Sequence, residues 1–171
     1  MIESESPLRY FPLLKVLRDH GVEFVVIGGF AVILHGVERA TKDVDVVPEQ
    51  SRENLARLWD ALVELEARPA EVGDSRPEEM PMPFSLEALV EGGGNWVLMT
   101  RLGRVDVMQW VPGVDTYEEL RANAESEDIP EVGGTVWFAG LDDLFTMKRE
   151  AGRPQDLFDI TALRMAHGLE E

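Results

Sequence analysis

The sequence contains no cysteine. This absence excludes disulfides, thiolate zinc sites and cysteine nucleophiles, and it fits the reducing cytosol. The sequence also has no uninterrupted apolar run of about 18 residues, so we expect no membrane span. The opening stretch MIESESPLRYF has neither a basic start nor an apolar core, so it does not resemble a signal peptide. Together these absences predict a cytoplasmic protein.

Basic residues are scarce in the chain. There are 16 lysines and arginines against 33 aspartates and glutamates, which gives a net charge of −17. An acidic surface repels phosphate backbones at long range, so nucleic acid is not favoured as a ligand, although a local basic patch could still hold one. The acidic residues also favour solubility, and that role alone accounts for most of them.

Histidine is also rare, and its positions indicate a structural role. His20, His35 and His167 are each followed directly by a glycine. A cationic residue in the last turn with glycine just beyond it is typical of a helix C-terminus. We therefore predict three helix ends here, rather than metal ligands or catalytic bases.

The order of the expected elements predicts an α/β (α+β) fold, a small mixed sheet flanked by helices. At 171 residues, one domain covering 1–171 is expected, with residues 141–171 as a C-terminal helical pair packed on it. Periodicity and turn residues predict helices over 6–21, 28–36, 51–67, 85–94, 116–126, 141–152 and 154–168. Strands are expected over 23–27, 42–48 and 135–140, with a hairpin over 95–111 that turns at Leu102–Gly103. The proline-rich stretch 69–83 is expected to be a mobile loop.

Residues 26–47, VIGGFAVILHGVERATKDVDVV, contain the first candidate motif. Gly28 and Gly29 open a helix directly after a buried strand. Backbone N–H groups at such a helix start can face phosphate oxygens, and glycine lets phosphates approach the backbone closely. The alternative interpretation is that the two glycines form only a turn.

The second motif is a set of aspartates on two strands. Asp43 and Asp45 are two residues apart and therefore share one face of a strand, while Val44 and Val46 face the other side. Asp106 lies in a similar pattern, between Val105 and Val107. If the two strands are neighbours, three carboxylates form a cluster that suits Mg²⁺. An Asp-x-Asp strand alone is more often a solvated face, but the order of glycines, paired aspartates and third aspartate favours a site.

These motifs resemble the signature of the nucleotidyltransferase superfamily, which has the polymerase-beta-like fold. The resemblance runs from about residue 10 to 165. The strings GGFAVILHGVERATKDVD and LDDLFTMKREAGRPQDLFDI are similar to small bacterial nucleotidyltransferases related to abortive-infection toxins. One departure stands out: many members carry Gly-Ser, whereas this chain has Gly28–Gly29 followed by Phe30. Backbone N–H groups would then contact the phosphates alone, and Phe30 is expected in the core.

The resemblance implies an enzyme that binds a nucleoside triphosphate such as ATP with two Mg²⁺ ions and transfers a nucleoside monophosphate to an acceptor. It assigns metal binding and catalysis to Asp43, Asp45 and Asp106, and phosphate binding to Gly28 and Gly29.

Cationic residues near these motifs are candidates for contacts with the triphosphate. Lys148 either binds the triphosphate or lies at a solvent-facing helix end with salt bridges. The solvent-facing interpretation is preferred for Arg149, Arg153 and Asp159. Arg39 and Lys42 either contact phosphates or offset the neighbouring acids.

The acceptor stays open at this stage: an RNA end, a protein hydroxyl or a small molecule such as an aminoglycoside. The resemblance also suggests a toxin–antitoxin system with an antitoxin or HEPN-type protein partner. In that setting the alternative to an active enzyme is a non-catalytic or partner-neutralised binding module.

Overall fold

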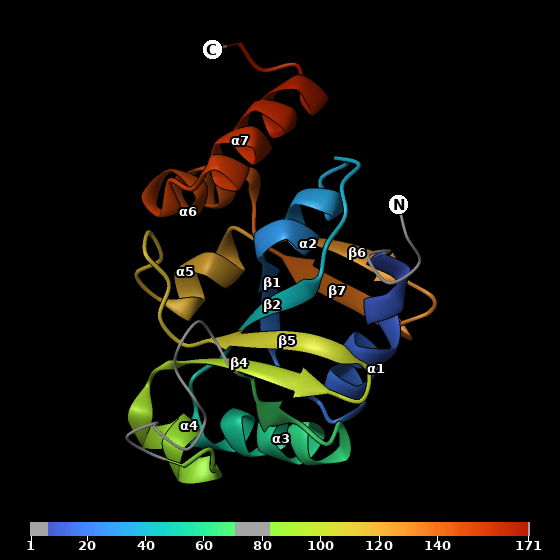
Figure 1. Cartoon of the computed structure of the whole chain (residues 1–171), viewed down its shortest axis with the longest axis vertical. Coiled ribbons are helices and arrows are strands. Elements are labelled where there is room, and N and C mark those ends of the chain that lie inside the picture. The colour runs from blue at the N-terminus through green and yellow to red at the C-terminus, as the bar shows by residue number, and fades with distance from the viewer. Residues whose placement is uncertain (1–6, 71–82, 171) are drawn as a thin grey trace.

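The computed structural model describes residues 7–70 and 83–170. Its centre is a seven-stranded mixed sheet in the order β3-β4-β5-β2-β1-β7-β6 (Figure 1). The strands are β1 (Phe24–Ile27), β2 (Asp43–Pro48), β3 (Arg68–Pro69), β4 (Asn95–Thr100), β5 (Gly103–Met108), β6 (Glu125–Ile129) and β7 (Gly134–Phe138). The pairs β1–β7 and β2–β5 are parallel, and the other neighbours are antiparallel. The predicted α/β class with a small mixed sheet flanked by helices is therefore confirmed.

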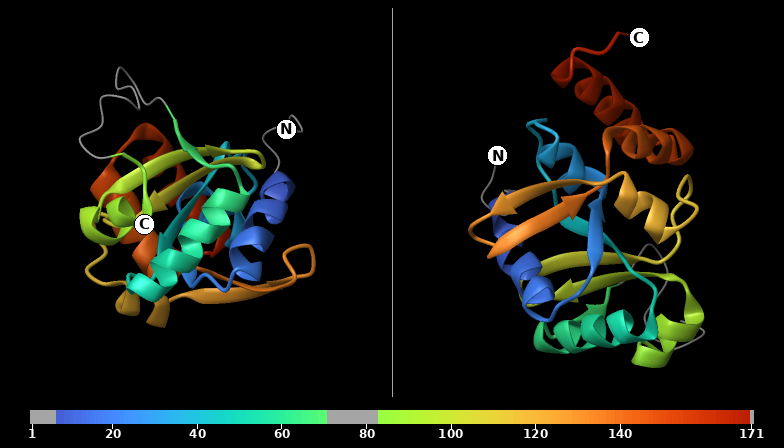
Figure 2. Two further views of the ribbon diagram at one scale, coloured as in Figure 1. Left: turned by 90° about the horizontal axis from the view of Figure 1, so that it is seen from below. Right: turned by 180° about the vertical axis from the view of Figure 1, so that it is seen from behind.

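Helices cover the sheet and extend from one end of it. They are α1 (Phe11–Asp19), α2 (Gly28–Leu34), α3 (Arg52–Glu64), α4 (Leu86–Gly92), α5 (Tyr117–Ala122), α6 (Leu141–Ala151) and α7 (Pro154–Ala166), with a 3-10 turn over Pro7–Tyr10. Figure 2 shows α1 and α3 side by side against one face of the sheet. The helices α6 and α7 lie at the opposite end of the molecule from α3 and α4 (Figure 1). No helix in the described part of the chain is long and apolar enough to cross a membrane.

Local signals in the sequence fix most helix boundaries. The Ser51 side chain accepts a hydrogen bond from the Asn54 N–H and begins α3, as predicted for an N-cap. Gly152 ends α6 in the left-handed conformation, and Pro154 lies in the first turn of α7. The three histidines are the C-caps of α1, α2 and α7, which confirms their predicted place.

The main hydrophobic core lies between the sheet and the helices α1 and α3. Val44, Val46, Val105 and Val107 are fully buried on the central strands β2 and β5. Phe30 is buried in the same core, as expected. Because strand side chains alternate, the valines anchor one face of these strands and the polar residues between them lie on the other face.

A second, smaller apolar cluster attaches the C-terminal helices. Val32 of α2 and Val37 pack with Phe145 of α6 and Leu163 of α7. This cluster holds the α6–α7 pair next to the second half of α2 and the loop that follows it.

Several sequence predictions differ from the structure. Strand β6 was missed: the expected helix over 116–126 ends at Ala122, and β6 begins at Glu125. The hairpin turn lies at Arg101–Leu102, one residue earlier than expected, because Gly103 already pairs with Thr100. The first helix begins at Phe11, after the 3-10 turn. Most of the expected loop over 69–83 lies outside the described residues, and Pro69 belongs to β3.

Candidate functional site

The sheet brings the three predicted aspartates together. In the parallel pair β2–β5, Asp43 is opposite Arg104 and Asp45 is opposite Asp106. One carboxylate oxygen from each of Asp43, Asp45 and Asp106 can be chosen so that all three lie within 4.8 Å of one another. Asp106 is buried and the other two are partly buried. The expectation that the Asp106 strand lies beside the Asp43 strand is confirmed.

Burial and mutual repulsion act on the ionisation of this cluster. Burial, followed by the nearby charges of Asp43 and Asp106, raises the pKa of Asp45 well above its usual value. Burial and Asp106 also raise the pKa of Asp43, although Arg104 opposes this effect. Carboxylates in such a cluster are costly to ionise together, and a bound cation relieves that cost. Three oxygen donors, partly dehydrated and in mutual reach, fit a Mg²⁺ ion.

Gly28 opens α2 directly beside this cluster. Strand β1 is antiparallel to β2 and places Ile27 opposite Asp45. Gly28, the next residue, therefore begins α2 beside the Asp45 side chain. Gly28 has φ +69°, and a Cβ there would meet the Asp45 side chain. Gly29 has ordinary φ, and a Cβ there would lie 3.0 Å from the guanidinium of Arg39. The N-cap residue Ile27 provides no side-chain cap to the first N–H groups of α2.

A cleft of about 460 Å³ contains all the residues predicted for the site. It is lined by predicted residues Gly28, Gly29, Arg39, Lys42, Asp43, Asp45, Asp106 and Lys148, together with Ala40, Thr41, Arg104, Arg153, Gln155 and Asp156. Carboxylates and cations therefore share one concave surface at the junction of β1, β2, β5 and the C-terminal helices.

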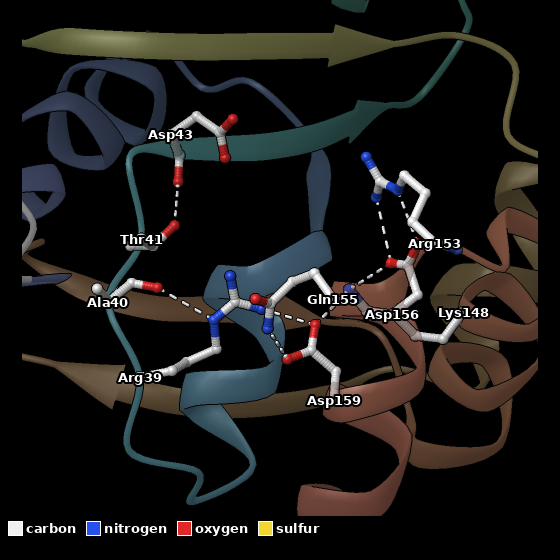
Figure 3. Close-up of polar contacts among 9 residues, drawn as sticks. All are labelled: Arg39, Ala40, Thr41, Asp43, Lys148, Arg153, Gln155, Asp156 and Asp159. Carbon is white, nitrogen blue, oxygen red and sulfur yellow. Dashed lines mark hydrogen bonds and ion pairs between the residues drawn. The ribbon is translucent and has the colours of Figure 1, made fainter.

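Lys148 joins the two C-terminal helices inside this surface. Its Nζ lies 2.8 Å from Asp159 Oδ2 and 3.2 Å from Asp156 Oδ1 (Figure 3). Lys148 is 6% exposed and Asp159 is fully buried. The solvent-facing interpretation is therefore wrong for both residues, because they pair with each other where α6 and α7 pack together.

Arg39 connects the loop before β2 to helix α7. Its Nη1 donates to Asp159 Oδ2 at 2.6 Å, and its Nε donates to the backbone oxygen of Ala40 (Figure 3). Asp159 thus receives two cations, Arg39 and Lys148, from segments far apart in the sequence. Gln155 donates to the other oxygen of Asp159 at 2.9 Å. This network closes one side of the cleft.

The remaining cations near the cleft are more exposed. Arg153 donates to Asp156, three residues later, and its side chain is 73% exposed, as the solvent-facing interpretation expects. Burial opposes ionisation of Asp156, but hydrogen bonds from Arg153 and Lys148 outweigh it and hold its pKa below the usual value. Arg149 is exposed and lies over the Phe145 ring. Lys42 is exposed on the loop beside Asp43.

Sequence reasoning missed Arg104, the cleft residue in contact with the aspartates. Its Nε and Nη2 each lie 2.9 Å from an oxygen of Asp106, and its Nε lies 3.6 Å from Asp43 Oδ2. Hydrogen bonding to Asp106 raises its own pKa further above the ordinary arginine value. The sequence signal was present, because Arg104 is two residues before Asp106 and therefore shares its strand face.

Residues 11–83 match a nucleotidyltransferase family. Its description is "Nucleotidyltransferase of unknown function (DUF6036)". The matched segment holds both glycines, Arg39, Lys42 and the Asp43–Asp45 pair, and it ends before Asp106 and Lys148. No curated protein matches the chain. The resemblance to nucleotidyltransferases is confirmed at the family level, and the toxin type stays a prediction.

Proposed function

We propose that the protein is a Mg²⁺-dependent nucleotidyltransferase. It moves a nucleoside monophosphate from a nucleoside triphosphate, with ATP as one candidate, to an acceptor hydroxyl or amine. The acceptor atom forms a bond to the α-phosphorus, the bond from that phosphorus to the bridging oxygen breaks, and pyrophosphate leaves. One observation carries the proposal: the oxygens of Asp43, Asp45 and Asp106 lie within 4.8 Å of one another beside the Gly28–Gly29 helix start.

The three aspartates divide the work of the site. Asp43 and Asp45 would hold both metal ions, and Asp106 would complete the coordination of the ion nearest the acceptor. When bound, the ions neutralise the negative charge that develops on the transferred phosphate and on pyrophosphate. Asp106, the most buried of the three, also accepts the acceptor proton in this assignment. The glycines at the start of α2 and the cations of the cleft would bind and orient the nucleotide.

The cationic and glycine residues supply the nucleotide contacts. Gly28 and Gly29 would let phosphate oxygens approach the start of α2, and Arg39 and Lys42 lie on the loop that borders the same cleft. Lys148 also lines the cleft, but two carboxylates already engage its Nζ. A contact between Lys148 and the triphosphate would therefore be made in addition to these two ion pairs.

The acceptor and the biological setting are further parts of the proposal. The net charge of −17 favours a cationic small molecule over an RNA end, and a protein hydroxyl is the third candidate. A role in a toxin–antitoxin system, with an antitoxin or HEPN-type partner, rests on the motif resemblance alone. In that setting the chain could act as a partner-neutralised enzyme or a non-catalytic binding module. The presence of all three aspartates supports the enzyme.

Transfer of label from each of four α-³²P-labelled nucleoside triphosphates tests the proposal. The protein is incubated with Mg²⁺ and a cell extract, and the products are then separated into small molecules, RNA and protein. A labelled product that is lost in Asp43→Asn/Asp45→Asn supports the enzyme and identifies the acceptor class. Arg149→Ala, which changes an exposed residue outside the cleft, is the matched control. Equal labelling by wild type and the double variant contradicts the proposal.

A further inference from the structure

Arg104 places a permanent cation on the same sheet face as the three aspartates. Strand β5 carries Arg104 and Asp106 two residues apart, and its parallel pairing with β2 sets Arg104 opposite Asp43. The alternation that turns Val105 and Val107 into the core therefore turns Arg104 toward the carboxylates. Its position is a consequence of register rather than of a flexible surface contact.

The Arg104 guanidinium donates hydrogen bonds to both carboxylate oxygens of Asp106. Nε is 2.9 Å from Oδ1 and Nη2 is 2.9 Å from Oδ2, a two-bond fork that uses both carboxylate oxygens. The same Nε lies 3.6 Å from Asp43 Oδ2. Paired arginine–carboxylate bonds of this kind combine charge with fixed geometry. Arg104 thus neutralises part of the cluster without any other ligand.

This contact competes with a divalent cation for the same atoms. A cation held by Asp43, Asp45 and Asp106 takes a lone pair from an Asp106 oxygen, and its double charge repels a guanidinium only a few ångströms away. The Arg104 side chain is 38% exposed whereas that of Asp106 is 12% exposed, so the arginine is the partner with room to move. It also lines the cleft in which phosphates would lie.

We propose that Arg104 is a positioning residue that makes cation binding depend on the nucleotide, by moving from Asp106 to a phosphate oxygen when both bind. With the cation alone, the displaced guanidinium exchanges a two-bond carboxylate contact for water. With the nucleotide present, it exchanges that contact for a phosphate, which suits the same fork. The inference rests on the proposed function and adds a dependence between its ligands: the cation binds tightly only together with the nucleotide.

Mn²⁺ titration followed by the electron paramagnetic resonance signal of the free ion tests this coupling. Wild type, Arg104→Gln and Arg101→Gln are compared, each with and without a nucleoside triphosphate analogue that cannot be cleaved at the α-phosphorus. Arg101 is exposed in the adjacent turn and does not line the cleft, so its variant matches the charge change. Arg104→Gln should bind Mn²⁺ alone roughly tenfold more tightly, and its enhancement by nucleotide should fall by a similar factor, within the usual range of couplings. Arg101→Gln should behave as wild type.

Three results separate the two proposals. Unchanged Mn²⁺ affinity and enhancement in Arg104→Gln overturn the inference. Cation and nucleotide binding by wild type without mutual enhancement also overturns it, and leaves the proposed function standing. Binding of neither ligand by wild type overturns both.

A second measurement uses the wild-type protein, so its outcome does not depend on whether the Arg104→Gln variant folds correctly. The arginine Nε–Hε signals of ¹⁵N-labelled protein are followed, with Arg104→Lys used to assign the Arg104 signal. That signal should shift when the Mg²⁺–analogue complex is added, and should hold its position with analogue alone. A signal that does not respond to the complex contradicts the movement of Arg104.

Discussion

The Asp45 carboxylate occupies the space that a side chain at Gly28 would need, so only glycine fits at that position. Strand register brings Asp45 opposite Ile27, and a Cβ on Gly28 would meet the Asp45 carboxylate. Gly28 also has φ +69°, a backbone conformation that costs other residues about 1–2 kcal/mol. The first glycine of the pair is therefore required by an aspartate of the cluster, and its contact with phosphate is a separate prediction.

Substitutions at the two glycines should have different effects. Gly28→Ala should lower the free energy of unfolding by at least about 1–2 kcal/mol and weaken cation binding, because it strains the backbone and displaces Asp45. Gly29→Ala should cost less stability than Gly28→Ala, because Gly29 does not have a left-handed φ and its Cβ meets only the Arg39 guanidinium, which must shift slightly against Asp159. It should still weaken nucleotide binding, by blocking phosphate approach or shifting Arg39. Urea denaturation and nucleotide titration measure both effects. Unaltered nucleotide affinity in Gly29→Ala would reduce that glycine to a turn residue.

The aspartate pair should control the response to cations. Mg²⁺ should raise the melting temperature of wild type more with a nucleoside triphosphate than without it, since the phosphates complete the coordination. Asp43→Asn/Asp45→Asn should remove this synergy. Thermal unfolding with each ligand alone and with both ligands measures it. Synergy that survives in the double variant would refute the assignment of the metal site.

Lys148 should prove important for stability. Replacing it with alanine leaves Asp156 and Asp159 buried without this cation, and loss of one partner of a buried ion pair typically costs about 3–5 kcal/mol. Arg39 still pairs with Asp159 and Arg153 with Asp156, so we expect the lower end of this range. The adjacent exposed residue gives a matched control, and Arg149→Ala should change stability by less than about 0.5 kcal/mol. Urea denaturation compares the two variants.

Nucleotide titration of the folded Lys148→Ala variant decides its second role. If Lys148 also contacts the triphosphate, loss of a charged hydrogen bond of about 1.5–3 kcal/mol should weaken binding about ten- to a hundredfold. Unchanged affinity would limit Lys148 to holding α6 and α7 together.

The raised pKa of Asp45 predicts a pH dependence of stability. In the folded protein this carboxyl keeps its proton at pH values where the unfolded chain, with a carboxyl pKa of about 3.9, has lost it. The folded state then binds more protons, so this group lowers stability as pH rises from about 4 through the folded pKa. Asparagine at this position cannot ionise. The stability of Asp45→Asn relative to wild type should therefore increase with pH across that range.

Urea denaturation of both proteins, without divalent cations, at several pH values from 4 to 8 measures the difference and cancels the contribution of the acids outside the Asp43–Asp45–Asp106 cluster. A difference that does not change with pH would contradict the raised pKa. Asp43→Asn should show the same trend, because the pKa of Asp43 is also raised.

The sequence by itself determined the local elements and the residue types that line the cleft. Alternation placed the valines of β2 and β5 in the core and the aspartates on the opposite face, and capping residues such as Ser51 and Gly152 fixed helix ends. Gly28, Asp43, Asp45 and Asp106 were predictable because strand period and turn chemistry act over a few residues. These short-range rules were enough to predict a carboxylate cluster beside a glycine turn, and the resemblance of this motif order to nucleotidyltransferases supplied the expected activity.

Only the tertiary structure decided how distant segments meet. Strand β6 could not be predicted, because four of its five residues are exposed and its partner β7 supplies the hydrogen bonds that stabilise it. The burial and ion pairs of Lys148 depend on the packing of α7 against α6, and the periodicity of a single helix does not predict that packing. The contact of Arg104 with Asp106 and Asp43 depended on strand register, and that register is set by packing across the whole sheet.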